Sequence, residues 1–177
     1  MILLINICKE KLHYYEFVKP IEDILKKAKI EFFVKHYNEL NEKELNKADK
    51  IIICGTSLKD NEFMENPGKF EWIKDFDRPI IGICGGMQLI GRIFKCEIKK
   101  KTEIGFFNEN FKNFLGLDGE KEVYHLHNFY CKFDENFSKF TKSEIDQAVK
   151  HKDKQIYAVL FHPEVRQKEM IVKFAKI

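Results

Sequence analysis

Cys84 is the residue of this sequence whose surroundings point most directly to chemistry. It follows a short apolar run, Ile80–Ile83, which is typical of a buried strand in a parallel sheet, and it precedes a helical pattern over Met87–Phe94. Glycines stand two residues before it and two residues after it, at Gly82 and Gly86. A nucleophile on a sharp turn between a strand and a helix is a nucleophile elbow. Both glycines are expected because the strand and the helix pack closely at such a turn.

The predicted turn also bears on the reactivity of the thiol. Cys84 is expected at the positive end of the helix dipole, which favours thiolate over thiol. The backbone N–H of Gly85 has no acceptor within the helix and is available to a developing oxyanion. A buried structural cysteine beside a glycine-rich turn is the alternative interpretation, and this motif alone does not decide between the two.

A thiol nucleophile needs a base, and the base needs a group that orients it. Ile156–Phe161 is another buried apolar run, His162 follows its end, and Glu164 stands two residues later. Side chains two residues apart in extended chain point the same way, so we expect the carboxylate to hold the imidazole. Pro163 fixes the backbone between them. A His-Pro-Glu run alone is more often structural, but together with the Cys84 elbow it predicts a Cys-His-Glu triad.

Two segments together carry a resemblance to a known family. They are Gly82-Ile83-Cys84-Gly85-Gly86-Met87-Gln88 and Phe161-His162-Pro163-Glu164, and they resemble the class I, triad-type glutamine amidotransferases, a resemblance that covers nearly the whole chain. It implies a glutaminase, in which Cys84 attacks the side-chain amide of L-glutamine, ammonia leaves, and water hydrolyses a γ-glutamyl thioester. It further implies that His162 is the general base and acid and that Glu164 is the orienting carboxylate.

The resemblance also implies an oxyanion hole. Gly85 supplies one backbone N–H, and the loop of Gly55 and Thr56 matches the region of the second donor. Family members often have Gly-Gly-Pro in this loop, whereas Thr56 and Ser57 occupy the second and third positions here. A hole that forms when a partner docks is one hypothesis raised by this departure. A plain strand-to-loop turn, with Ser57 capping a helix, is the alternative.

Substrate-binding residues follow from the same resemblance. Gln88 matches the family glutamine that helps to hold the substrate. His127, Asn128 and Phe129 resemble the segment whose backbone grips the α-amino and α-carboxylate ends of glutamine. An ordinary half-buried strand over Glu122–Cys131 is the alternative for this segment, because its residues alternate with a period of two.

The same alternation places His125 and His127 on one face of the predicted strand. Two imidazoles on one face are a conceivable metal pair. No third ligand of suitable type is evident nearby in the sequence. We therefore expect no metal and no cofactor.

Composition indicates one globular domain over residues 1–177. The chain is 44% hydrophobic and 33% charged, and its net charge of +3 is too small to predict nucleic-acid binding. Its five cysteines lack metal-ligand spacing, and without a signal peptide they favour a reducing cytoplasm. No apolar run approaches the ~20 residues of a membrane span.

Strand and helix patterns alternate in the order of a doubly wound fold with right-handed crossovers. We expect a flavodoxin-like α/β domain with a mainly parallel sheet, helices on both faces and a small antiparallel excursion. Besides the segments already named, the expected strands are Met1–Ile7, Glu31–Lys35, Lys50–Cys54, Cys96–Lys99, Lys100–Phe107 and Thr141–Lys150, and the expected helices are Tyr14–Lys29, Leu40–Ala48, Gly68–Phe76 and Arg166–Lys176.

Two further function classes stay open beside the glutaminase. The resemblance and the short chain after Glu164 imply a separate synthetase subunit that receives the ammonia. Met87 is closer to the CTP and imidazole-glycerol-phosphate types than to the Gly-His-Gln of GMP synthesis, although one residue decides little. A related enzyme that cleaves another γ-glutamyl compound is the first alternative. A catalytically silent regulatory or binding protein on the same fold is the second.

Overall fold

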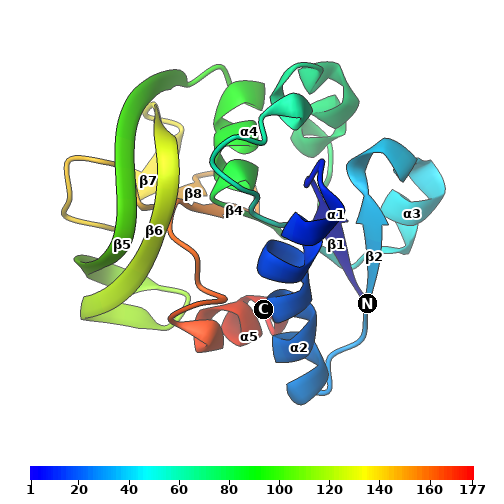
Figure 1. Ribbon diagram of the computed structural model, residues 1–177, viewed down its shortest axis with the longest axis horizontal. Coiled ribbons are helices and arrows are strands. Elements are labelled where there is room, and N and C mark those ends of the chain that lie inside the picture. Colours follow the sequence, from blue (N-terminus) through cyan, green and yellow to red (C-terminus); the bar gives the residue numbers. More distant parts are fainter.

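A seven-stranded sheet forms the centre of the protein in the computed structural model, which describes residues 1–177 (Figure 1). The strand order is β2-β1-β3-β4-β9-β8-β7. The first five strands in this order are parallel, and β8 and β7 form the antiparallel edge. The strands are β1 (Ile2–Asn6), β2 (Phe32–His36), β3 (Lys50–Ile53), β4 (Ile80–Ile83), β7 (Phe137–Lys139), β8 (Ala148–His151) and β9 (Ile156–Val159). The predicted flavodoxin-like, doubly wound fold is confirmed.

Apolar residues of the central strands alternate between two hydrophobic cores, one on each face of the sheet. Leu4, Ile52 and Ile81 belong to one core, which is covered by α2 (Lys19–Lys27) and α5 (Lys168–Ala175). Leu3 and Ile51 belong to the other core, which is covered by α4 (Gly85–Ile93) and the 3-10 helix η4 (Pro67–Lys74). Both faces are thus buried, which explains why these strands have continuous apolar sequences.

The N-terminal helical segment is less regular than predicted. It begins with α1 (Lys11–His13), passes through a π-helical turn, η1 (Tyr14–Val18), and then becomes regular in α2. Pro20 lies in the first turn of α2, as expected. Proline lacks an N–H and crowds the carbonyl four residues earlier, which accounts for the wider turn before it. The π turn buries Phe17, whose ring lies 5.4 Å from the ring of His162.

A long antiparallel ribbon of β5 (Glu97–Phe114) and β6 (Leu117–Lys132) curves beside the central sheet (Figure 1). It is the predicted antiparallel excursion, although the two short strands expected over 96–107 are one strand. The strand predicted over Thr141–Lys150 is wrong for its first seven residues, since β8 begins at Ala148. Ser143 donates to the Ile145 carbonyl and Thr141 accepts from the Gln147 amide, so local side-chain bonds replace a strand ladder. β7 was not predicted.

The remaining helices are short. They are η2 (Tyr37–Glu39), α3 (Glu42–Lys47) and η3 (Glu62–Met64). Asn41 caps α3 by accepting from the amides of Lys43 and Glu44, which sets its start two residues later than predicted. The segment expected as a helix over Gly68–Phe76 is the 3-10 helix η4. No helix is long and apolar enough to cross a membrane.

The turn between β4 and α4 depends on two glycines. A Cβ on Gly82 would lie 2.5 Å from the backbone of Gly86, and a Cβ on Gly86 would lie 2.5 Å from the carbonyl oxygen of Ile53. Neither contact is sterically allowed, so strand and helix meet backbone to backbone. The close packing predicted for the elbow is confirmed.

We expect Gly82→Ala to destabilise the fold by at least about 2 kcal/mol, because the added methyl meets backbone that cannot move aside. Urea unfolding measures the change. Gly68→Ala is the matched control, since its Cβ would meet nothing closer than Asn66 Oδ1 at 3.5 Å. Equal stabilities of the two variants would contradict the steric account.

Candidate functional site

Cys84 sits at the start of α4 with strained backbone. Its φ of 49° and ψ of −101° lie outside the regions that non-glycine residues favour. Its amide donates to the Val159 carbonyl at 2.8 Å, and its Sγ lies 3.4 Å from the Leu126 carbonyl oxygen. The bond to Val159 fixes the turn against β9, and the contact with Leu126 fixes the sulfur against β6.

His162 and Glu164 form a buried pair that follows β9 closely. His162 Nδ1 lies 2.7 Å from Glu164 Oε1, and both side chains are almost inaccessible to solvent. The predicted contact is present, but the predicted reason is wrong, because the backbone forms a turn in which the His162 carbonyl accepts from the Val165 amide at 3.1 Å. Tyr124 holds the other side, since its carbonyl accepts from the His162 amide.

The imidazole of His162 faces the elbow. A Cβ built on Gly55 would lie 2.8 Å from His162 Cε1 and 3.6 Å from Cys84 Cβ, so Gly55 leaves room for the ring beside the sulfur. Burial alone would lower the pKa of His162, but the Glu164 carboxylate and the Cys84 sulfur outweigh it and hold that pKa well above its usual value. His162 Nε2 is buried and has no hydrogen-bond partner.

A cavity of about 260 Å³ opens beside Cys84. This volume lies just below the roughly 300 Å³ at which pockets for drug-sized ligands begin, so it suits a molecule as small as an amino acid. The lining contains most of the predicted oxyanion and substrate residues, namely Thr56, Gly85, Gln88, His127, Asn128 and Phe129. Gly55 does not line the cavity, because it lies behind it against His162.

Hydrogen bonds tie the cavity wall together. Gln88 Nε2 donates to the Phe129 carbonyl at 2.9 Å. Asn128 accepts from Thr102 Oγ1 at 2.9 Å and donates to the Leu58 carbonyl at 3.4 Å, so it joins β5 to the loop after β3. The backbone of β6 therefore forms the wall opposite α4.

Asp60 is a buried site residue that the sequence analysis missed. Its Oδ2 accepts from Thr56 Oγ1 at 2.8 Å and from the Lys9 amide at 2.6 Å, while Oδ1 is buried without a partner. This carboxylate thereby anchors the loop that carries Thr56. An acidic residue four positions after a strand-end threonine is the signal in the sequence, and it is a weak one.

The structure supplies the third donor that the sequence analysis did not find beside His125 and His127. Glu103 on β5 is the ladder partner of His127, and its Oε2 lies 3.1 Å from His125 Nδ1 and 3.1 Å from His127 Nε2. Lys101 Nζ lies 2.9 Å from the other carboxylate oxygen. We call Glu103, His125 and His127 the Glu103 cluster.

Burial and neighbouring charges set the protonation of the Glu103 cluster. Burial lowers the pKa of His127 to about 4 and also lowers the pKa of His125. Burial alone would raise the pKa of Glu103, but Lys101 and His125 outweigh it and lower that pKa. At neutral pH the cluster thus contains two neutral imidazoles and one carboxylate.

Comparisons with known proteins agree with the fold and the motifs. The family described as glutamine amidotransferase class-I matches residues 12–175. The glutamine-hydrolysing subunit of GMP synthase from Archaeoglobus fulgidus is 30% identical over 132 residues, which cover 69% of each chain. The same subunit from Methanobrevibacter smithii is 35% identical over 105 residues, which cover 54% of this chain and 55% of the relative. Imidazole glycerol phosphate synthase subunit HisH of Bacteroides thetaiotaomicron is 29% identical and covers 83% of this chain and 86% of its own.

Solved structures show the same architecture. A protein of Thermoplasma acidophilum described as a GMP synthase subunit superposes with a TM-score of 0.86 at 23% identity, covering 99% of this chain and 92% of that chain. A glutamine amidotransferase of Thermotoga maritima superposes with a TM-score of 0.73 at 18% identity, covering 99% and 80%. The fold, the two motifs and the family match therefore agree, and the chain belongs to the class I glutamine amidotransferase family.

Proposed function

We propose that residues 1–177 act as one glutaminase domain that hydrolyses L-glutamine to glutamate and ammonia. The observation that carries the proposal is the buried imidazole of His162, which Glu164 holds through Nδ1 and which keeps Nε2 free beside Cys84. An imidazole held at one nitrogen and free at the other is what a thiol nucleophile requires of its base.

The reaction follows from this arrangement. His162 Nε2 takes the thiol proton, and Cys84 Sγ attacks the side-chain amide carbon of glutamine. Collapse of the tetrahedral intermediate breaks the C–N bond, and the same imidazole gives its proton to the departing nitrogen, which leaves as ammonia. Water then attacks the γ-glutamyl thioester with His162 again as the base, which releases glutamate and restores the thiol. Glu164 stabilises the imidazolium at both stages.

The oxyanion is proposed to lie at the start of α4. The Gly85 N–H stands in the first turn of this helix, where amides have no intrahelical acceptor. The loop of Gly55 and Thr56 is proposed to supply the second donor. Thr56 Oγ1 is already bonded to Asp60, so this donor is a backbone amide whose orientation depends on the Asp60 anchor.

The substrate is proposed to lie between α4 and β6. Gln88 is held by the Phe129 carbonyl and borders the cavity from the helix side. The backbone of His127, Asn128 and Phe129 borders it from the strand side and offers amides and carbonyls to the α-carboxylate and α-amino groups. These polar groups support an amino acid as the occupant.

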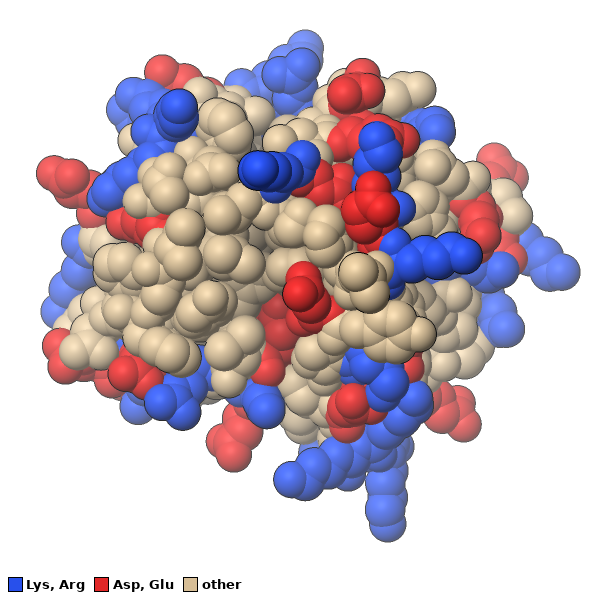
Figure 2. Space-filling view, in the orientation of Figure 1, with Lys and Arg blue, Asp and Glu red and all other residues tan.

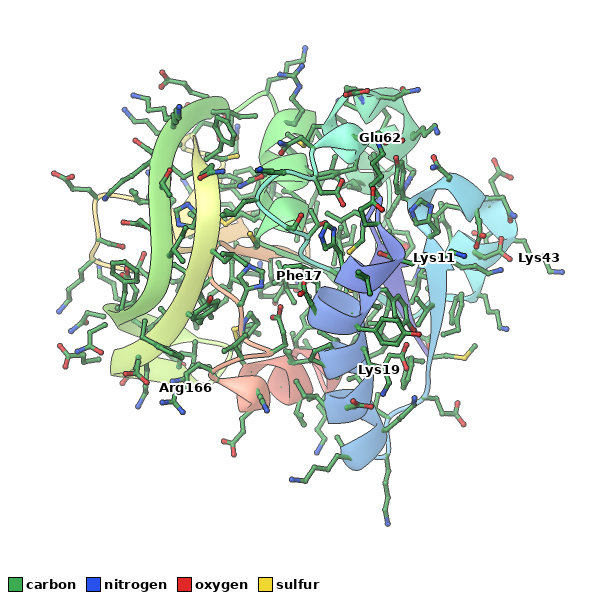
Figure 3. All side chains as sticks on the ribbon, in the orientation of Figure 1. Lys11, Phe17, Lys19, Lys43, Glu62 and Arg166 are labelled. Atoms are coloured by element: carbon green, nitrogen blue, oxygen red, sulfur yellow. The ribbon has the colours of Figure 1, made fainter.

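A separate synthetase subunit is the proposed acceptor of the ammonia. Figure 2 shows a largely uncharged face over β5 and β6, with charged side chains mainly at its borders. On β5, Ile104 is 55% exposed and Phe106 is 54% exposed. The Phe106 ring lies 5.1 Å from Tyr124, and Tyr124 lies 6.4 Å from the His162 ring, so this apolar surface borders the proposed site. Arg166, labelled in Figure 3, stacks over Phe106 at its rim.

Cys84→Ala is expected to lower glutamine-dependent ammonia release by at least about three orders of magnitude, because removing the nucleophile leaves no route to the thioester. Ammonia is measured with and without glutamine. Cys96→Ala is the matched control and should retain wild-type activity, since Cys96 does not line the cavity. Equal release by wild type and Cys84→Ala would refute the proposed reaction.

Iodoacetamide at pH 7 is expected to modify Cys84 before the other buried thiols. Burial raises the pKa of Cys8 to about 11 and of Cys131 to about 12, and it raises the pKa of Cys54 well above its usual value. A raised pKa keeps these thiols protonated and unreactive until the pH approaches that value. Peptide mass spectrometry identifies the modified residue, and glutamine should slow its labelling. Earlier modification of Cys8 or Cys131 would be inconsistent with this order.

Adding the synthetase subunit is expected to accelerate glutamine hydrolysis, because docking would order the loop of Gly55 and Thr56. Phe106→Ser should abolish this stimulation while leaving the activity of the isolated chain unchanged. Ile177→Ser, which alters an equally exposed apolar residue at the C-terminus, is the control and should be stimulated normally. The proposal fails if the isolated chain is already as active as the complex.

A further inference from the structure

We propose that the Glu103 cluster binds one divalent ion of the zinc class through Glu103 Oε2, His125 Nδ1 and His127 Nε2. These three donors come from two neighbouring strands and lie on the face of the ribbon opposite the one that carries Tyr124 and Leu126. The site is distinct from the proposed glutaminase site and goes beyond the proposed function.

The donor spacing is the first argument. Two ligands about 2.0–2.1 Å from a tetrahedral zinc ion lie roughly 3.3 Å from each other. The carboxylate oxygen lies 3.1 Å from each imidazole nitrogen, and all three donor atoms lie within 4.8 Å of one another. The spacing is close to that of ligands around one ion.

Unpartnered buried atoms are the second argument. His127 Nε2 lies 3.1 Å from the carboxylate but is not aligned for a hydrogen bond, and neither of its ring nitrogens has a partner. His127 is 1% exposed. A buried polar atom without a partner costs about 1–3 kcal/mol, which an ion at this position would offset.

The surroundings offer a fourth donor. Gln147 is buried, its amide nitrogen lies 3.4 Å from Glu103 Oε2, and its Oε1 has no partner. Oxygen and nitrogen of an amide exchange places when the group turns over. The turned amide places Oε1 at the ligand spacing derived above and completes a four-coordinate set.

The outer partners agree with a bound ion. Lys101 occupies the second oxygen of Glu103, which leaves one oxygen for the metal. Glu109 Oε1 lies 3.9 Å from His125 Nε2, the ring nitrogen that the proposed ion leaves free. A carboxylate near the free nitrogen of a ligating histidine is a common outer contact of metal sites.

Local strand geometry directs Glu103 into the cluster. The β5–β6 ladder shifts register between Lys100 and Glu103, and such a bulge re-aims the side chain that follows it. The donor set also selects the ion. Calcium and magnesium prefer oxygen ligands, whereas two imidazoles with one carboxylate suit zinc and its neighbours.

The test uses the full chain after chelator treatment, and the metal alone. Zn²⁺ should bind with one equivalent in calorimetry and raise the melting temperature, and a chelator should reverse the shift. Co²⁺ should give the visible bands of a four-coordinate site without a sulfur-to-cobalt charge-transfer band. That spectrum distinguishes the cluster from the five thiols, Cys84 included.

Variants locate the ion. Glu103→Gln and His125→Asn should each weaken Zn²⁺ binding by more than about 10-fold, the lower end of the loss caused by removing an outer partner. His151→Asn, a buried histidine on β8 outside the cluster, should bind Zn²⁺ as the wild type does. Where a variant does not fold, as judged by circular dichroism, the wild-type Co²⁺ spectrum decides.

Three results would overturn the inference. One is wild-type protein that binds neither ion with a stoichiometry of one. Another is a Co²⁺ spectrum with sulfur charge transfer, which would place the ion on a thiol. The last is undiminished Zn²⁺ affinity in folded Glu103→Gln and His125→Asn. None of these results bears on glutamine hydrolysis, so failure here leaves the proposed function standing.

Discussion

Backbone contact between β4 and α4 is the constraint on which the site depends. Gly82 and Gly86 let the strand and the helix approach more closely than any side chain allows. The chain must then reverse within one residue, and Cys84 takes the strained conformation that this reversal requires. Strain of this kind costs of order 1–3 kcal/mol and persists only where surrounding structure enforces it. Here the enforcement comes from the Ile53 backbone beneath Gly86 and from the Val159 carbonyl that binds the Cys84 amide.

The parallel pairing of β4 with β9 then brings distant residues together. Ile83 pairs with Val159, so the residues that follow these strands emerge at the same edge of the sheet. Cys84 follows β4 at once, and His162 follows β9 after two residues. A one-residue shift in this register would turn one of the two strands over. The continuous apolar sequence of both strands, buried on both faces, holds the register.

Features set by local sequence were predictable, and features set by tertiary contacts were not. The elbow, the strand order and the His162–Glu164 pair follow from apolar runs and motif spacing. The π turn before Pro20, the anchoring role of Asp60 and the irregular loop of 141–147 depend on which groups meet across the fold. Glu103 shows the difference most clearly, because it is 22 residues from His125 in sequence and bonded to it in space. Only the ladder pairing of β5 with β6 reveals that contact.

β6 serves two regions because its side chains alternate. Tyr124 lies near His162, and the Leu126 carbonyl receives the Cys84 sulfur, whereas His125 and His127 turn to the opposite face and meet Glu103. The backbone between these side chains is the wall of the cavity. Whatever fixes the histidine face therefore also fixes the wall, since a strand cannot shift one face alone. The ordering of the Glu103 cluster and the shape of the proposed glutamine pocket are consequently mechanically coupled through a single strand.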